Sequence, residues 1–144
     1  MAQVHPYLTF DGNCEAAFTF YKSIFGGEFP YIGKYAEMPP TEGFEIPESE
    51  AQKIMHVSLK LGAGTMLMGC DSSSAFGQQP VQGSNFSVYI TAETKEEADR
   101  IFNGLSAGGT VTMPLADTFW GSYFGMFTDK FGILWMIGYD ECEQ

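Results

Sequence analysis

FGMFTDKFGILWMIGYD, residues 124–140, contains two apolar runs separated by a short polar turn. The turn from Asp129 to Gly132 starts with a charged residue and ends with glycine, which tolerates the positive φ of tight hairpin turns. The run that follows is apolar from Ile133 to Ile137, whereas a half-buried strand would alternate apolar and polar residues. The stretch therefore predicts a β-hairpin whose second strand is covered on both faces.

The first half of the chain carries a matching hairpin and a helix before it. Residues 54–71, IMHVSLKLGAGTMLMGCD, give two strand-like runs that turn at residues 62–64. The preceding helix is predicted to start at Asn13, a favoured N-cap residue, and to end at Gly26. Its apolar face has the i, i+3, i+4, i+7 spacing of an amphipathic helix and comprises Ala17, Phe20, Tyr21 and Ile24.

The second hairpin is preceded by a helix of the same kind. Thr94 and Glu97 form a capping box. Its apolar residues lie 81 positions after those of the first helix and comprise Ala98, Ile101, Phe102 and Leu105. A strand precedes each helix, at residues 5–10 in the first half and 85–90 in the second. The order is therefore βαβββ twice, with a period near 80 residues.

This repeat predicts an α+β fold of two βαβββ modules, residues 1–72 and 83–140, joined by a loop at residues 73–82. Each module is expected to form a curved mixed sheet with its helix on the outer face, so that the other faces of the sheets line a shared cleft. By alternation, Ile133, Trp135 and Ile137 are expected to face the helix, and Leu134 and Met136 the cleft.

Composition limits the partners and the compartment. The net charge of −11 disfavours nucleic acids and anionic membranes, and no apolar run approaches the roughly 20 residues of a membrane helix. The N-terminus carries no basic region followed by an apolar core, which argues against secretion. Three cysteines form no Cys-x-x-Cys pair. These features predict a reduced, cytoplasmic protein.

The modules resemble the vicinal oxygen chelate superfamily, which includes glyoxalase I, extradiol dioxygenases and bleomycin-resistance proteins. Within it, residues 6–21, PYLTFDGNCEAAFTFY, and residues 117–137, DTFWGSYFGMFTDKFGILWMI, resemble the PhnB-like subfamily. That subfamily is often labelled a demethylubiquinone methyltransferase. The sequence offers no glycine-rich loop between a parallel strand and a helix, which a nucleotide-type cofactor would need. The resemblance also implies a homodimer.

The superfamily resemblance implies a divalent metal held by residues of the first and last strands of each module. The corresponding positions here are His5, Met68, Asn85 and Met136. Only His5 is a good ligand, because an amide is a weak donor and a thioether suits hard or borderline divalent ions poorly. We therefore expect no cofactor, and a divalent metal is disfavoured.

Two other groups of residues are candidates for chemistry. His5 and His56 are the only histidines, and with a carboxylate such as Asp71 they are candidates for acid–base catalysis in the first module. The alternative is that both histidines have structural roles. The residues expected to line the ligand cleft are aromatic, apolar or amide-bearing. They are Tyr7, Met68, Asn85, Trp120, Tyr123, Leu134 and Met136.

Two functions remain open at this point. The first is a binding protein that holds a small, partly apolar ligand without a metal, as the resemblance to bleomycin-resistance proteins implies. The second is a glyoxalase-type lyase or isomerase that uses His5 in a metal site or in an acid–base site. The sequence decides neither the ligand nor whether catalysis occurs.

Overall fold

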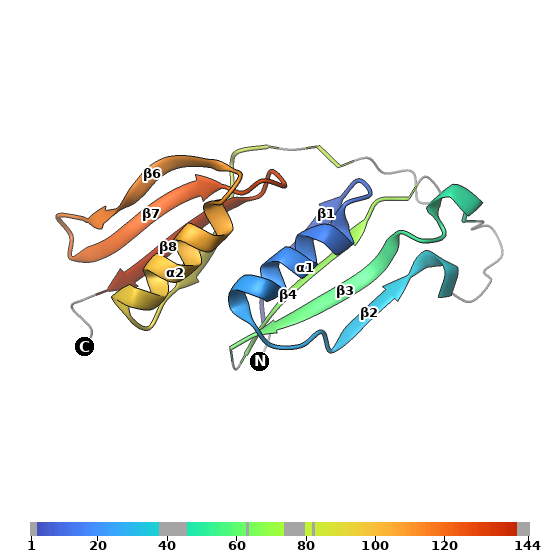
Figure 1. Ribbon diagram of the computed structural model, residues 1–144, viewed down its shortest axis with the longest axis horizontal. Coiled ribbons are helices and arrows are strands. Elements are labelled where there is room, and N and C mark those ends of the chain that lie inside the picture. The colour runs from blue at the N-terminus through green and yellow to red at the C-terminus, as the bar shows by residue number, and fades with distance from the viewer. Residues whose placement is uncertain (1–2, 38–45, 63, 74–79, 82, 141–144) are drawn as a thin grey trace. The chain divides into compact units, whose positions relative to one another are not determined.

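The computed structural model describes residues 3–37, 46–62, 64–73, 80–81 and 83–140. The chain consists of two compact units, Met1–Val81 and Gln82–Gln144, and each contains its own sheet and helix (Figure 1). Most of the predicted connecting loop, residues 74–79 and 82, lies outside the described residues. Among the described residues, no helix has the length and apolar character needed to cross a membrane.

In its described residues, the first unit has one α-helix, two short 3₁₀ helices and four strands. In chain order they are β1 (Tyr7–Phe10), α1 (Cys14–Phe25), β2 (Tyr31–Lys34), η1 (Tyr35–Glu37), η2 (Glu48–Glu50), β3 (Ile54–Leu61) and β4 (Thr65–Asp71). The strand order in the sheet is β1-β4-β3-β2. β1 runs parallel to β4, and the other neighbours are antiparallel.

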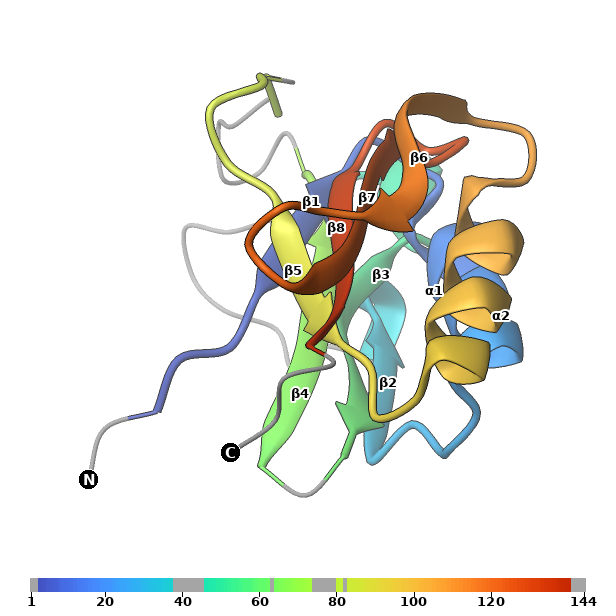
Figure 2. The same ribbon diagram turned by 90° about the vertical axis from the view of Figure 1, so that its left-hand side faces the viewer.

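The second unit repeats this arrangement. Its elements are β5 (Val88–Thr91), α2 (Lys95–Ser106), β6 (Thr110–Asp117), β7 (Ser122–Thr128) and β8 (Leu134–Asp140). The strand order is β5-β8-β7-β6, again with one parallel pair, β5 and β8. In Figure 2, α1 lies against one face of its own sheet and α2 against one face of its own. The predicted α+β fold with the βαβββ order in each unit is confirmed.

The buried stripe of α1 is rotated from the predicted one. Ala17 and Tyr21 are buried as expected, but Cys14 and Phe18 complete the stripe, and Phe20 and Ile24 are only half-buried. Phe18 packs closely over Gly69 of β4, where a Cβ atom would lie 2.8 Å from the phenylalanine ring. The helix therefore approaches the sheet at a glycine, which a helical periodicity by itself does not show.

The N-terminus of α1 is held by a residue far away in the sequence. Asn13 occupies the N-cap position as predicted, but its side chain makes no capping hydrogen bond. Instead, the Asp71 carboxylate accepts hydrogen bonds from the backbone N–H groups of Gly12 and Cys14, both 2.9 Å. Its other oxygen accepts from Ile54 N–H at 2.9 Å. Asp71 thus ties the last residue of β4 to both α1 and β3.

The local predictions for the second unit are confirmed. Thr94 caps α2 by accepting a 3.0 Å hydrogen bond from Glu97 N–H, and all four predicted apolar residues of α2 are buried. Gly132 has φ of +92° in the predicted turn. The Asp129 carboxylate closes that turn by accepting from Phe131 N–H (2.7 Å) and Ile133 N–H (3.0 Å).

The β8 strand separates its side chains as alternation predicts. Trp135 and Ile137 are fully buried on the side that packs against α2. Leu134 and Met136 alternate with them and are half-buried on the opposite side of the sheet. The expectation that both faces are covered is therefore correct for the helix side, whereas the other side of the strand remains partly accessible.

Stability at alkaline pH is expected to depend on Tyr35. Its hydroxyl donates a 2.7 Å hydrogen bond to the Asp71 carbonyl, and burial raises the pKa of Tyr35 from 10.0 to about 12. Because the pKa of Tyr35 is higher in the folded state than in the unfolded state, its protonated hydroxyl contributes stability that is complete below pH 10. This contribution is lost as the pH rises through about 12. Over this pH range, the free energy of unfolding measured with urea should decline less steeply for Tyr35→Phe than for wild type. Equal slopes would contradict this assignment.

Candidate functional site

The first sheet has a buried face and an accessible face. The residues that point toward α1 are almost fully buried and comprise Leu8, Phe10, Val57, Leu59 and Leu67. On the opposite side, Tyr7, Met68, Ser58 and Tyr31 form one row across β1, β4, β3 and β2. We call this side, with His56 in the next row, the open face of the first sheet. Tyr7 and Tyr31 are 48% and 46% exposed.

Two tyrosines flank His56 on the open face of the first sheet. The Tyr7 hydroxyl lies 3.1 Å from His56 Nδ1, and the centroids of the two rings are 5.6 Å apart. The Tyr31 ring lies 5.7 Å from the His56 ring on another side and covers Gly33. Partial burial raises the pKa of Tyr7, and the neighbouring Cys70 side chain raises it further. Tyr7 is therefore a neutral phenol at physiological pH.

The second sheet also has an open face, and it is richer in methionine. Tyr89, Met136, Met126 and Met113 form a row across β5, β8, β7 and β6 on the side opposite α2. In the first sheet the equivalent parallel pair is Tyr7 and Met68, so each open face has a tyrosine and a methionine in register. Methionine is unbranched and polarizable, which suits an apolar surface that adapts to a ligand.

Aromatic rings extend the open face of the second sheet. Tyr89 stacks with Phe124 at 6.2 Å, and Phe124 lies 6.4 Å from Trp120 in the β6–β7 turn. The phenol of Tyr89 lies over Gly138, where an added Cβ atom would collide with the hydroxyl oxygen. Trp120 is 59% exposed. Sequence reasoning missed Tyr89 and Phe124, although each alternates with helix-facing neighbours and Phe124 is two residues from Met126.

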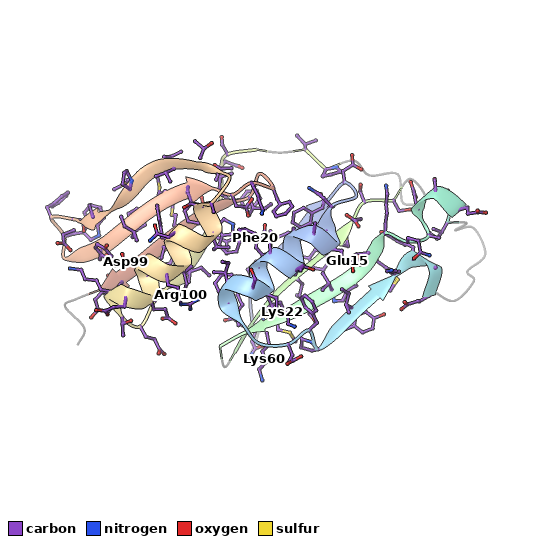
Figure 3. All side chains as sticks on the ribbon, viewed as in Figure 1. Glu15, Phe20, Lys22, Lys60, Asp99 and Arg100 are labelled. Atoms are coloured by element: carbon purple, nitrogen blue, oxygen red, sulfur yellow. The ribbon has the colours of Figure 1, made fainter. Side chains whose placement is uncertain are left out.

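Tyr123, also predicted to line the ligand cleft, lies on the helix side of the sheet and not on this face. It lies three residues from Met126 on β7 and therefore points to the opposite side of the sheet. Its hydroxyl donates a 2.6 Å hydrogen bond to Asp99, which Figure 3 labels on α2. The Lys95 ammonium lies 4.9 Å from the centre of its ring. Tyr123 thus links β7 to α2 through its contacts with Asp99 and Lys95.

The predicted catalytic group of His5, His56 and Asp71 is not assembled. His5 Nδ1 accepts a 3.1 Å hydrogen bond from Met66 N–H, at the start of β4. His56 pairs with Tyr7 on the open face. Asp71 is 1% exposed, and its carboxylate accepts from three backbone N–H groups instead. The three residues therefore have separate hydrogen-bond partners in this structure, and an acid–base role for His5 or His56 stays a prediction.

The positions that the resemblance assigns to a metal also fit one poorly. Met68 and Met136 lie on the open faces of their sheets, and Asn85 precedes β5. Within residues 3–37, 46–62, 64–73, 80–81 and 83–140, no three His, Cys, Asp or Glu side chains gather in a way that could hold a metal ion. A thioether in place of a carboxylate is a poor donor for such an ion.

Comparison with known proteins places the chain in a family. Residues 2–138 match the sequence pattern of the family described as 3-demethylubiquinone-9 3-methyltransferase. Protein YjdN of Escherichia coli strain K12 is 32% identical over 141 residues, covering 92% of this chain and 91% of that protein. The chain belongs to this PhnB-like family. The resemblance inferred from the N-terminal and C-terminal motifs is confirmed.

Solved structures support the same assignment. Protein PA1353 from Pseudomonas aeruginosa is 38% identical and superposes with a TM-score of 0.82, covering 97% of this chain and 98% of that one. A PhnB protein from Bacillus cereus, described as a putative 3-demethylubiquinone-9 3-methyltransferase, is 29% identical. It superposes with a TM-score of 0.74, covering 96% of this chain and 99% of that one. A glyoxalase/bleomycin-resistance/dioxygenase domain from Frankia, 13% identical, shares the fold, with a TM-score of 0.68 covering 100% of this chain and 96% of that one. The PhnB-like family thus has the predicted superfamily fold.

Proposed function

We propose that this PhnB-like protein binds a small, partly apolar molecule on the open faces of its sheets, without the divalent metal implied by its superfamily. The observation that carries the proposal is the in-register pair of tyrosine and methionine on each open face, Tyr7 with Met68 and Tyr89 with Met136. The methionines stand at the positions where the resemblance implies metal ligands. They supply apolar contact area in place of coordinating atoms.

The polarity of the two faces supports a ligand with both apolar and polar parts. The second open face offers methionine side chains and the stacked rings of Tyr89 and Phe124. The first open face adds a histidine between two tyrosines. Binding sites for small molecules are typically apolar surfaces with a few placed polar groups. Whether both faces contact one ligand in a shared cleft stays a prediction.

Methyl transfer, which the family description names, is not the function we propose. A nucleotide-type cofactor is usually held by a glycine-rich loop between a parallel strand and the helix that follows. In this chain β1 leads to α1 through Asp11, Gly12 and Asn13, which contain a single glycine. The carboxylate of Asp71 already accepts from two N–H groups at that helix start, so these donors are not available to a cofactor.

A thermal-shift screen against a metabolite library tests the proposal. A ligand at about 100 times its Kd stabilises the folded state by about 2.7 kcal/mol, which corresponds to a rise in Tm of roughly 8 °C. The rise should be the same with and without EDTA. It should shrink in Tyr89→Ala, on the open face, and persist in Val111→Ala, whose side chain is 45% exposed on β6. Shifts that EDTA abolishes would refute metal-free binding.

A glyoxalase-type lyase or isomerase is the second candidate. The contact between Tyr7 and His56 favours it, because histidine beside a neutral phenol is suited to proton transfer near neutral pH. Acid–base chemistry at His56 would replace the role that sequence reasoning gave to His5. Turnover in a glyoxalase assay by the wild type, lost in His56→Ala and retained in His5→Ala, would favour this candidate.

A further inference from the structure

The environment of His56 determines which hydrogen-bonding group it presents to a ligand. The open face of the first sheet places His56 between Tyr7 and Tyr31, with ring centroids 5.6 and 5.7 Å away. Nδ1 is the ring nitrogen in contact with the Tyr7 hydroxyl, at 3.1 Å. Nε2 has no hydrogen-bond partner within the described part of the chain. In the described residues that are not exposed, every buried side-chain N or O atom has a hydrogen-bond partner. Because Nε2 has none, it is not buried and reaches solvent.

The proton positions follow from the strengths of the donors and acceptors. Burial raises the pKa of the Tyr7 hydroxyl, and the neighbouring Cys70 side chain raises it further, so the phenol stays protonated. A thiol sulfur is a weak acceptor, whereas the unprotonated nitrogen of imidazole is a strong one. The Tyr7 O–H therefore donates preferentially to His56 Nδ1, at 3.1 Å. This arrangement leaves the proton of neutral His56 on Nε2.

We propose that His56 is the polar anchor of the ligand, and that its Nε2–H donates a hydrogen bond to the carbonyl oxygen of a small, uncharged aromatic molecule. The proposal rests on the proposed function and names the class of ligand that the first sheet accepts. The rings of Tyr7 and Tyr31, together with Met68, provide the surface against which an aromatic ring packs.

The neighbouring groups favour an uncharged ligand over an anion. Tyr7, Tyr31, Met68 and Cys70 carry no positive charge, and a single neutral N–H offers little to replace the water lost by a carboxylate. A carbonyl oxygen requires only one donor, and its transfer out of water costs less free energy than that of a carboxylate. The two tyrosine rings beside His56 and its one N–H together match the two parts of an aryl carbonyl compound.

Two probes of matched shape test the proposal by NMR titration. Acetophenone carries the carbonyl oxygen, and ethylbenzene is a similarly sized molecule without it. Wild-type protein should bind acetophenone roughly fivefold more tightly, since one net hydrogen bond contributes about 1 kcal/mol. In His56→Phe, which keeps a ring and removes the donor, the preference should disappear. A preference that survives in His56→Phe, or that is absent in wild type, would overturn the proposal.

The tautomer of His56 provides a test that needs no ligand. Long-range ¹H–¹⁵N correlation spectra above neutral pH should show wild-type His56 with its proton on Nε2, and Tyr7→Phe should give a mixture of tautomers. A wild-type proton on Nδ1 would overturn the anchor even if both probes bind. If neither probe shifts signals of either open face while the tautomer is as expected, the proposed function fails for these probes and the donor assignment stands.

Discussion

Replacing Asp71 with alanine is expected to lower the free energy of unfolding by about 4 kcal/mol. The side chain is 1% exposed, and its two oxygens accept three backbone hydrogen bonds of 2.9 Å each. Two of these hold the N-terminus of α1 and the third holds Ile54 at the start of β3. The variant leaves these donors without their acceptor inside the first unit, which costs more than the loss of an exposed ion pair.

Asp140 provides a matched control for Asp71. Both are aspartates at the last residue of the final strand of their unit, but Asp140 is exposed. Asp140→Ala should change the free energy of unfolding by no more than about 0.5 kcal/mol. Asp71→Asn keeps one acceptor oxygen and should fall between alanine and wild type. Urea unfolding followed by circular dichroism measures all three, and equal losses in Asp71→Ala and Asp140→Ala would refute the assigned role.

Replacing Trp135 with alanine is expected to destabilise the fold by a similar amount, about 4 kcal/mol. Trp135 is fully buried between α2 and the sheet, so its removal leaves a cavity in the core of the second unit. Its Nε1–H also donates a 2.8 Å hydrogen bond to the buried Asp129 carboxylate. Truncation therefore removes both apolar packing and one of the bonds that hold the β7–β8 turn.

Trp120 is the matched control, since the chain has only two tryptophans. It is 59% exposed, and Trp120→Ala should alter the free energy of unfolding by no more than about 0.5 kcal/mol. Tryptophan fluorescence offers a second readout. Emission from Trp120→Phe, in which only Trp135 remains, should be characteristic of a buried indole. Emission typical of exposed tryptophan, or equal destabilisation by the two alanine variants, would contradict the position of Trp135 in the core.

Local patterns were sufficient to predict the βαβββ repeat, but they did not predict long-range contacts. The capping box at Thr94 and the turn at Asp129 depend on residues close in sequence, and both are confirmed. The cap of α1 comes instead from Asp71, which is 57 residues from Cys14. The buried stripe of α1 shifted for the same reason, because Phe18 packs on a glycine of β4. Neither contact appears in the periodicity of the helix.

For the candidate site too, the features that depend on strand alternation could be predicted, whereas those that depend on tertiary structure could not. Alternation along β8 correctly placed Met136 opposite Trp135. Applied along β7, it would also have assigned Phe124 to the open face and Tyr123 to the helix side. Five aromatic residues lie close together between residues 119 and 127, and their clustering alone does not show which side of the sheet each one faces. The contact between Tyr7 and His56 required the pairing of β1, β4 and β3, because the two residues are 49 positions apart.

Metal analysis of the purified protein tests metal-free binding most directly. The protein is incubated with Ni²⁺, Zn²⁺, Fe²⁺ or Mn²⁺, dialysed and measured by elemental mass spectrometry beside His5→Ala. His5 is the one good ligand among the positions that the resemblance assigns to a metal, and its Nδ1 already accepts from Met66 N–H. We predict substoichiometric metal in both proteins. A stoichiometric ion in the wild type that is lost in His5→Ala would contradict the proposed function.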